Sequence, residues 1–134
     1  MAVRPTPRSM MVCEDVVPDA TNRNRLSLLR VVHAIKPKVG VEYPLTHPQL
    51  CAFAQLTEGR GTGQMRVEVR HADMDEVVYR SPTVEVKFPG NDPLTIHGVY
   101  FRFLKIQFPS PGLYWIQLWY DDSLLIQNPV VLRP

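Results

Sequence analysis

The sequence predicts an all-β fold, a two-layer antiparallel β-sandwich of about eight or nine short strands. Along the chain, apolar and polar side chains alternate in short runs, with the period of two that is typical of half-buried strands. The 134 residues include 13 prolines, and proline breaks helices but is tolerated at strand ends and in turns. No long stretch has the period of a helix, and an open barrel is the main alternative architecture.

The clearest element is a β-hairpin near the C-terminus, formed by residues 113–120 and 123–127. Asp121 and Asp122 lie between its strands and favour a tight turn, because aspartate tolerates unusual backbone angles. The first strand is apolar on both sides, which indicates a central strand or one that is covered on its outer side. One side carries Tyr114, Ile116, Leu118 and Tyr120, and the other carries Leu113, Trp115, Gln117 and Trp119.

The remaining strands are predicted from the same alternation. They cover residues 10–16, 26–35, 49–57, 65–70, 76–80, 82–88 and 95–108, and residues 130–132 continue the hairpin after a proline. In the strand 65–70, Met65, Val67 and Val69 are predicted to face the core. Their neighbours Arg66, Glu68 and Arg70 mix the two signs of charge, so we expect a solvated sheet face there.

The long strand 95–108 changes its phase part-way along. Val99, Phe101 and Phe103 share one side, whereas Leu104, Ile106 and Phe108 share the other. A β-bulge near Phe103 and Leu104 would bring both sets into the core, because one extra residue reverses the direction of all later side chains. The alternative is a strand that is buried on both sides.

Length and composition predict a single domain over residues 10–134, preceded by a flexible tail over residues 1–9. Hydrophobic residues make up 45% of the chain and charged residues 21%, and the net charge of +2 is too small to indicate nucleic-acid binding. The chain has no apolar run that could span a membrane, and its N-terminus lacks the apolar core of a secretory signal. We therefore expect a cytoplasmic protein whose two cysteines, Cys13 and Cys51, stay reduced.

Three stretches together resemble an uncharacterised bacterial family of short β-sandwich domains of unknown function. They are residues 13–16, residues 22–35 with the core Asn-Arg-Leu-Ser-Leu-Leu, and residues 111–131 from Pro-Gly-Leu-Tyr onward. The resemblance implies a compact sandwich and carries over no catalytic or binding residue. The Gly-x-Tyr start of the hairpin, Gly112 to Tyr114, is also similar to immunoglobulin-like sandwiches in general architecture, although their Cys-Trp-Cys spacing is missing.

No motif in the sequence predicts catalysis, a metal site or a cofactor. The glycine-rich residues 59–63 are followed by a strand rather than by the helix of a phosphate-binding loop, so they predict a hairpin turn. The acidic runs 73–76 and 121–122 predict solvated turns rather than calcium ligands. His33, His47, His71, His97 and the two cysteines lack the spacing of metal ligands, and we expect no enzyme activity.

The candidate interaction residues are Trp115, Trp119, Leu113 and Gln117, which share one side of the hairpin strand. If the opposite side fills the core, the two tryptophans lie on the outer face and mark a contact surface for a partner protein or a second copy. In two alternatives the tryptophans point into the core or are covered by the chain's own loops. An exposed edge strand adds a second possible route of association.

The sequence therefore predicts a non-catalytic protein-interaction or self-association module, without a nucleic-acid or membrane partner. The alternative function is a small-ligand or carbohydrate-binding sandwich. In that case Trp115, Trp119 and Tyr120 would form a stacking platform.

Overall fold

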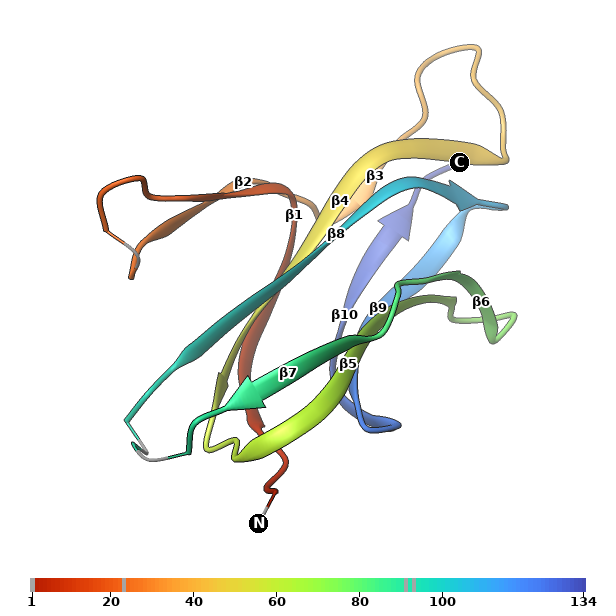
Figure 1. Ribbon diagram of the computed structural model, residues 1–134. Helices are drawn as coiled ribbons and strands as arrows, with labels where there is room; N and C mark the ends of the chain where they lie inside the picture. Colours follow the sequence, from red (N-terminus) through yellow and green to blue (C-terminus); the bar gives the residue numbers. More distant parts are fainter. Residues whose placement is uncertain (1, 23, 91, 93) are drawn as a thin grey trace.

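The chain folds into two β-sheets that face each other (Figure 1). The computed structural model describes residues 2–22, 24–90, 92 and 94–134, and these residues contain ten strands and no helix, hence none that could cross a membrane. The strands are β1 Thr6–Pro18, β2 Leu26–Val31, β3 Ala34–Ile35, β4 Leu45–Thr57, β5 Gly61–His71, β6 Glu76–Arg80, β7 Val84–Phe88, β8 His97–Phe108, β9 Gly112–Tyr120 and β10 Ser123–Leu132. The all-β sandwich predicted from the sequence is confirmed.

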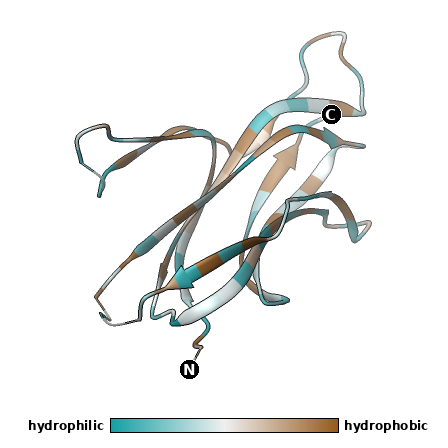
Figure 2. Cartoon of the chain, in the orientation of Figure 1, coloured by the Kyte–Doolittle hydropathy of each residue, from teal (hydrophilic) through white to brown (hydrophobic). Residues whose placement is uncertain are grey.

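The two sheets have four and six strands. The four-stranded sheet has the order β2-β1-β4-β8, and the six-stranded sheet has the order β3-β10-β9-β5-β6, with β7 also pairing with β5. Alternating residues from β4, β5 and β9 fill the space between the sheets, because every second side chain of a strand points to the same side. These core residues include Leu50, Ala52, Leu56, Met65, Val67, Val69, Ile116 and Leu118, all of which are buried. Figure 2 shows the same alternation as brown and teal bands along β7.

The predicted strand 26–35 is divided between the two sheets. Its first part, β2, pairs with β1, and its last two residues form β3, which pairs in parallel with β10. The crossing lies at Val32 and His33: the Val32 N–H donates to the Val12 carbonyl in one sheet, and the His33 carbonyl accepts from Val131 N–H in the other. The fully antiparallel arrangement expected from the sequence is thus corrected at β3.

The N-terminal strand is longer than the sequence predicted. β1 begins at Thr6, and Val3 already forms an isolated bridge with Arg60, so residues 6–9 of the expected tail belong to the sheet. The structural reason is that β4 extends beside these residues and pairs with them as far as Thr57. Met1, Arg23, Asn91 and Pro93 lie outside the described residues, and with them the corresponding parts of the predicted tail, the loop before β2 and the turn before β8.

The phase change predicted in β8 is present. Phe103, Ile106 and Phe108 are buried, whereas Leu104 is 57% exposed and does not join the core as expected. Lys105 has a positive φ of 54° and lies at the step where the partner strand has Pro48, whose nitrogen carries no hydrogen to donate. Pairing with β4 continues in the same register on both sides of this step. The phase therefore changes without the β-bulge that the sequence predicted near Phe103 and Leu104, because a bulge would add a residue to one strand only.

The entry into β9 is fixed by Tyr114. Its hydroxyl donates to the carbonyl oxygen of Ser110 at 2.7 Å, and its ring is fully buried between the edges of Phe108 and His71. A tyrosine that bonds the backbone a few residues upstream is a feature of the tyrosine corner of immunoglobulin-like sandwiches. The structure therefore gives the predicted Gly-x-Tyr likeness a physical basis.

The two predicted hairpin turns are confirmed. Asp121 and Asp122 have positive φ angles of 46° and 64°, as a two-residue turn of type I′ requires, and they connect β9 to β10. The glycine-rich segment connects β4 to β5, with Glu58 at a φ of 65° and Gly61 at 77°. Its backbone therefore serves a hairpin, as expected, and does not lead into a helix.

Tyr120 at the end of β9 is 4% exposed, and its hydroxyl has no hydrogen-bond partner among the described residues. A buried polar group without a partner costs free energy, whereas removing it leaves the apolar packing of the ring in place. We therefore expect Tyr120→Phe to keep the free energy of unfolding unchanged or to raise it by about 1 kcal/mol. Urea denaturation followed by tryptophan fluorescence checks this, and a marked loss of stability would contradict it.

Candidate interaction surface

Strand β9 presents its two tryptophans on the outer face of the six-stranded sheet. Tyr114, Ile116, Leu118 and Tyr120 point into the core and are at most 4% exposed. Trp115 and Trp119 therefore lie on the opposite side, where both are half-buried. The sequence left open whether the tryptophans point outward, point into the core or are covered by loops. In the structure they point outward and are only partly covered.

Strand β5 brings a row of charged side chains against this aromatic row. In the antiparallel register, Arg66 faces Trp119, Glu68 faces Gln117, and Arg70 faces Trp115. Directly opposite residues of neighbouring strands point to the same side of a sheet, so the two rows form one surface. We call it the Trp–Arg face and define it by Trp115, Gln117 and Trp119 of β9, Arg66, Glu68 and Arg70 of β5, and Arg80 of β6.

Glu68 is the centre of the Trp–Arg face. Its carboxylate accepts hydrogen bonds from Arg66 Nε at 2.7 Å, Arg80 Nε at 3.2 Å and an Arg70 guanidinium nitrogen at 3.3 Å. These three guanidinium groups cover it so that only 1% of its side chain is exposed. The prediction of a solvated stripe on β5 is therefore wrong for Glu68, because Arg80 reaches it from a neighbouring strand that the sequence of β5 does not reveal.

The arginines hold Glu68 in its charged form. Burial by itself raises the pKa of a carboxylic acid, but the hydrogen bond from Arg66 and the positive charges of Arg80 and Arg66 outweigh this effect. The pKa of Glu68 consequently lies below its ordinary value. The carboxylate is ionised at neutral pH and ties β5 to β6.

Trp119 and Gln117 are held in place by the same group of side chains. The Arg66 guanidinium lies over the Trp119 ring, 5.0 Å from its centroid, in a cation–π arrangement. The Trp119 indole N–H donates to the Gln117 side-chain oxygen at 3.2 Å, and the Gln117 amide nitrogen donates to Gln127 of β10 at 2.9 Å. The aromatic and charged side chains of this face are therefore fixed before anything binds.

The two acidic runs flank the Trp–Arg face. Asp122, in the turn after β9, pairs with Arg66 at 3.1 Å, and Asp75, in the turn after β5, pairs with Arg70 at 3.2 Å. Both carboxylates are exposed, as the predicted solvated turns require. Sequence reasoning missed the ion pairs between these acidic turns and the arginines. The Arg66–Asp122 pair, like the Arg80–Glu68 pair, depends on which strands are neighbours in the sheet.

Leu113 shares its side of β9 with Trp115, but it lies at the start of the strand and faces Val131 of β10. It lines a hollow together with Met11, Val31 and Pro129, where β1 and β10 approach each other. Of the four predicted interaction residues, the structure thus groups Trp115, Gln117 and Trp119 with the arginines and places Leu113 at the start of β9. Gln117 is only 6% exposed and acts mainly by orienting Trp119.

The two thiols lie next to each other in the four-stranded sheet. Cys13 and Cys51 face each other on β1 and β4, and both are fully buried and free. Burial, and then the facing Cys51, raise the pKa of the Cys13 thiol to about 11, and burial also raises the pKa of Cys51. Protonated thiols are poor nucleophiles and poor metal ligands.

Two of the four histidines, His71 and His97, have structural partners. The two ring nitrogens of His71 lie 3.2 Å from the Met74 amide and 3.3 Å from the Ser110 hydroxyl, and His97 packs edge-on against Phe88. Within the described part of the chain, no three His, Cys, Asp or Glu side chains lie close enough to hold a metal ion.

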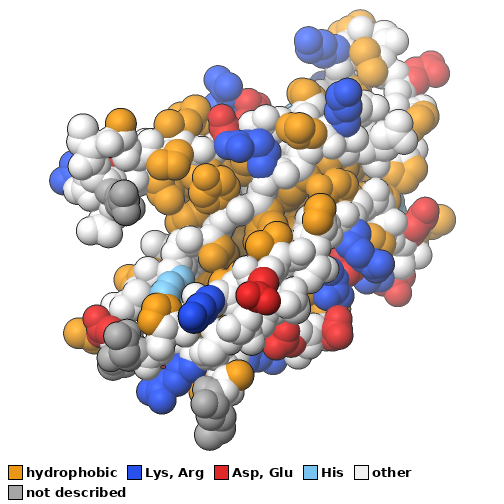
Figure 3. All heavy atoms as spheres, in the orientation of Figure 1, with side chains coloured by type: hydrophobic (Ala, Val, Ile, Leu, Met, Phe, Trp, Pro, Cys, Tyr) orange, Lys and Arg blue, Asp and Glu red, His pale blue; other side chains and the backbone are white. Residues whose placement is uncertain are grey.

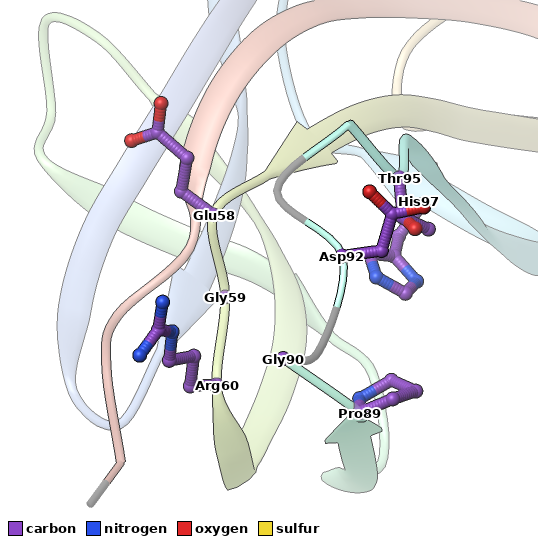
Figure 4. A pocket seen from close by; sticks show the side chains of 8 residues that line it. All are labelled: Glu58, Gly59, Arg60, Pro89, Gly90, Asp92, Thr95 and His97. Carbon is purple, nitrogen blue, oxygen red and sulfur yellow. The ribbon is translucent and has the colours of Figure 1, made fainter.

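A small hollow lies beside the β4–β5 turn (Figure 4). It is lined by Glu58, Gly59, Arg60, Pro89, Gly90, Asp92, Thr95 and His97. Glu58 and Arg60 extend on one side of the turn, whereas Asp92 and His97 lie on the other, so these groups do not converge on one point. Glu58 is also engaged elsewhere, since it pairs with Arg8 at 3.0 Å.

The family model of a family of unknown function, DUF6941, matches residues 8–133. The chain belongs to this family. The resemblance found in the sequence is thereby confirmed as far as the family is concerned, and the match covers every strand of the DUF6941 domain almost completely. A search of curated proteins found no match to this DUF6941 chain.

Proposed function

We propose that this DUF6941 domain is a non-catalytic protein-interaction module whose docking surface is the Trp–Arg face. The observation that carries the proposal is the arrangement of tryptophan and arginine on an outer sheet face, with Arg66 stacked on Trp119. Tryptophan and arginine are the residues most enriched among those that dominate binding energy in protein interfaces. A bacterial, cytoplasmic setting, as expected from the sequence, is part of this proposal.

The fixed geometry of the face supports protein docking. Binding costs free energy when flexible side chains become ordered, and side chains that are already held in place reduce this cost. Arg66 and Arg70 have only 19% and 25% of their side chains exposed, because both are tied to Glu68. Exposed Asp122 and Asp75 form a polar rim at the two ends of the face.

The carbohydrate alternative has less support. Its stacking platform included Tyr120, which is buried in the core, so the platform would be limited to the two tryptophans. Arg66 already lies over the Trp119 ring, which a sugar would have to share or displace. We therefore prefer a protein partner.

Replacing Trp119 by alanine tests the proposal. We expect Trp119→Ala to weaken partner binding at least roughly tenfold, because it removes both the aromatic ring and the support for Arg66. Tagged wild type and variant are compared by affinity purification with quantitative mass spectrometry, and each protein enriched by wild type is then titrated directly by calorimetry. Val39→Ala, at a fully exposed loop position, is the matched control and should bind as wild type does.

A folded Trp119→Ala variant that binds every partner with the affinity of wild type would refute the proposal. Circular dichroism establishes whether the variant is folded. Light scattering on both proteins shows whether the partner is a second copy, in which case the dimer is lost in the variant.

A further inference from the structure

Strand β8 is one edge of the four-stranded sheet, where it pairs with β4 along almost its whole length (Figure 1). An edge strand has backbone N–H and C=O groups on its free side that match the spacing of another extended strand. Which residues of β8 present these groups follows from the hydrogen-bond pattern of the sheet.

One hydrogen bond of β1 shows which way the backbone amide groups of each residue point. The Val12 carbonyl accepts a hydrogen bond from the Val32 N–H, so the amide groups of Val12 point toward β2. Successive residues of a strand direct their amide groups to alternate sides, so those of Cys13 point toward β4. Cys13 and the facing Cys51 are therefore a hydrogen-bonded pair.

The same alternation extends across β4 to β8. Ala52 follows Cys51 and directs its amide groups toward β8, where it faces Phe101. Gly98, Tyr100 and Arg102 consequently direct their N–H and C=O groups away from the sheet. Among the residues that the structure describes, none hydrogen-bonds to these groups.

Both faces of β8 are also incompletely covered. Phe101 and Val99 point toward the core but are only half-buried. On the outer face, Tyr100 is 41% exposed and Leu104 is 57% exposed. Figure 3 shows hydrophobic side chains gathered on both sides of the course that β8 takes in Figure 1.

We propose that two copies of this chain associate through antiparallel pairing of their β8 strands, related by a two-fold axis at Phe101. In this register Tyr100 of each copy faces Arg102 of the other, and the two Phe101 side chains face each other on the core side. The paired residues from Gly98 to Leu104 make about eight backbone hydrogen bonds, two for each facing hydrogen-bonded pair. The two four-stranded sheets become one continuous sheet.

The side chains favour this register over its neighbours. A shift in one direction places the two Arg102 residues opposite each other, and directly opposite like charges destabilise a strand pair. A shift in the other direction leaves Arg102 facing Gly98, which offers no side chain. In the proposed register each tyrosine ring faces an arginine, a favourable cation–π combination. The Arg102 side chain is 42% exposed even though it pairs with Asp15, so it remains accessible to the tyrosine.

The end of β8 limits the pairing to this segment. Lys105 and its positive φ interrupt the regular edge, and lysine and irregular backbone are devices by which proteins prevent edge-to-edge association. The residues before Lys105, 97–104, keep regular pairing with β4 and contain neither a lysine nor a positive-φ residue other than glycine. The proposed axis lies within this regular segment.

Proline at position 100 tests the proposal with a matched control. Tyr100→Pro removes an outward N–H and blocks strand addition, whereas the fold tolerates proline where the N–H of an edge strand faces solvent. Tyr100→Thr removes the same ring but keeps the N–H. We expect wild type to dimerise in sedimentation-equilibrium experiments. The dimer dissociation constant of Tyr100→Pro should be at least roughly tenfold higher than that of Tyr100→Thr.

Residue-resolved hydrogen exchange supplies a second measurement that needs no variant. The amides of Gly98, Tyr100 and Arg102 should become more protected as the concentration of wild type rises. A monomer at every concentration, a dimer with unprotected amides at these positions, or a folded Tyr100→Pro variant that dimerises like Tyr100→Thr would each overturn the proposal.

This inference uses different residues from the Trp–Arg face. A dimer that is lost in Trp119→Ala but retained in Tyr100→Pro assigns self-association to the Trp–Arg face and refutes pairing through β8. The reverse result supports pairing through β8 and leaves the Trp–Arg face to be judged by its binding to other proteins.

Discussion

Tyr114→Ala is expected to lower the free energy of unfolding by about 3–5 kcal/mol, the range for truncating a fully buried aromatic side chain. The ring is fully buried, and its removal leaves a cavity between Phe108 and His71. The loss also frees the Ser110 carbonyl that the hydroxyl now satisfies. Urea denaturation measures the change.

Tyr114→Phe separates the hydrogen bond from the packing. It keeps the ring but leaves the Ser110 carbonyl without its partner, so we expect a smaller loss of about 1–3 kcal/mol. If Tyr114→Phe were as stable as wild type, the hydrogen bond would not fix the entry into β9, and the loss in Tyr114→Ala would be due to packing alone.

Glu68→Gln is expected to destabilise the fold by about 2 kcal/mol, less than the roughly 3–5 kcal/mol of breaking a fully buried ion pair. The variant leaves three arginines close together without the carboxylate that neutralises them. The effect is reduced because Arg80 is 60% exposed and can turn toward water. Glu85→Gln, at an exposed position of β7, is the control and should lie within about 0.5 kcal/mol of wild type.

The contribution of Glu68 should depend on pH with a defined sign. The pKa of Glu68 in the folded protein lies below its ordinary value of 4.5, because of its arginine partners. Its stabilising effect is therefore fully present above pH 4.5 and is lost as the pH falls through the folded pKa. The stability difference between wild type and Glu68→Gln should shrink as the pH falls below 4.5. A difference that stays constant down to pH 3 would contradict a lowered pKa of Glu68 in the folded protein.

Much of the fold was predictable because it depends on local alternation. Met65, Val67 and Val69 are buried as their period of two indicated, and Asp121 with Asp122 makes the predicted turn. The division of residues 26–35 between two sheets was not predictable, since β3 is held by the distant strand β10. Leu104 was misplaced because the irregular step at Lys105 depends on its partner strand.

The Trp–Arg face was predictable only in part. The alternation in residues 113–120 identified the row that contains both tryptophans, but it fitted either orientation of the strand. The arginine partners were assigned to a separate, solvated stripe, because no local pattern shows that β5 and β9 are neighbours. Arg80 was not recognised at all.

The sequence by itself determined that the chain is all-β, which residues alternate, and where the tight turns lie, because these properties depend on residues a few positions apart. Only the tertiary structure decided which side of β9 faces the core, which charges surround Glu68, and which edge of the four-stranded sheet β8 occupies. These features arise from strand order and register, which join residues far apart in the chain and leave no periodic signal within any one strand.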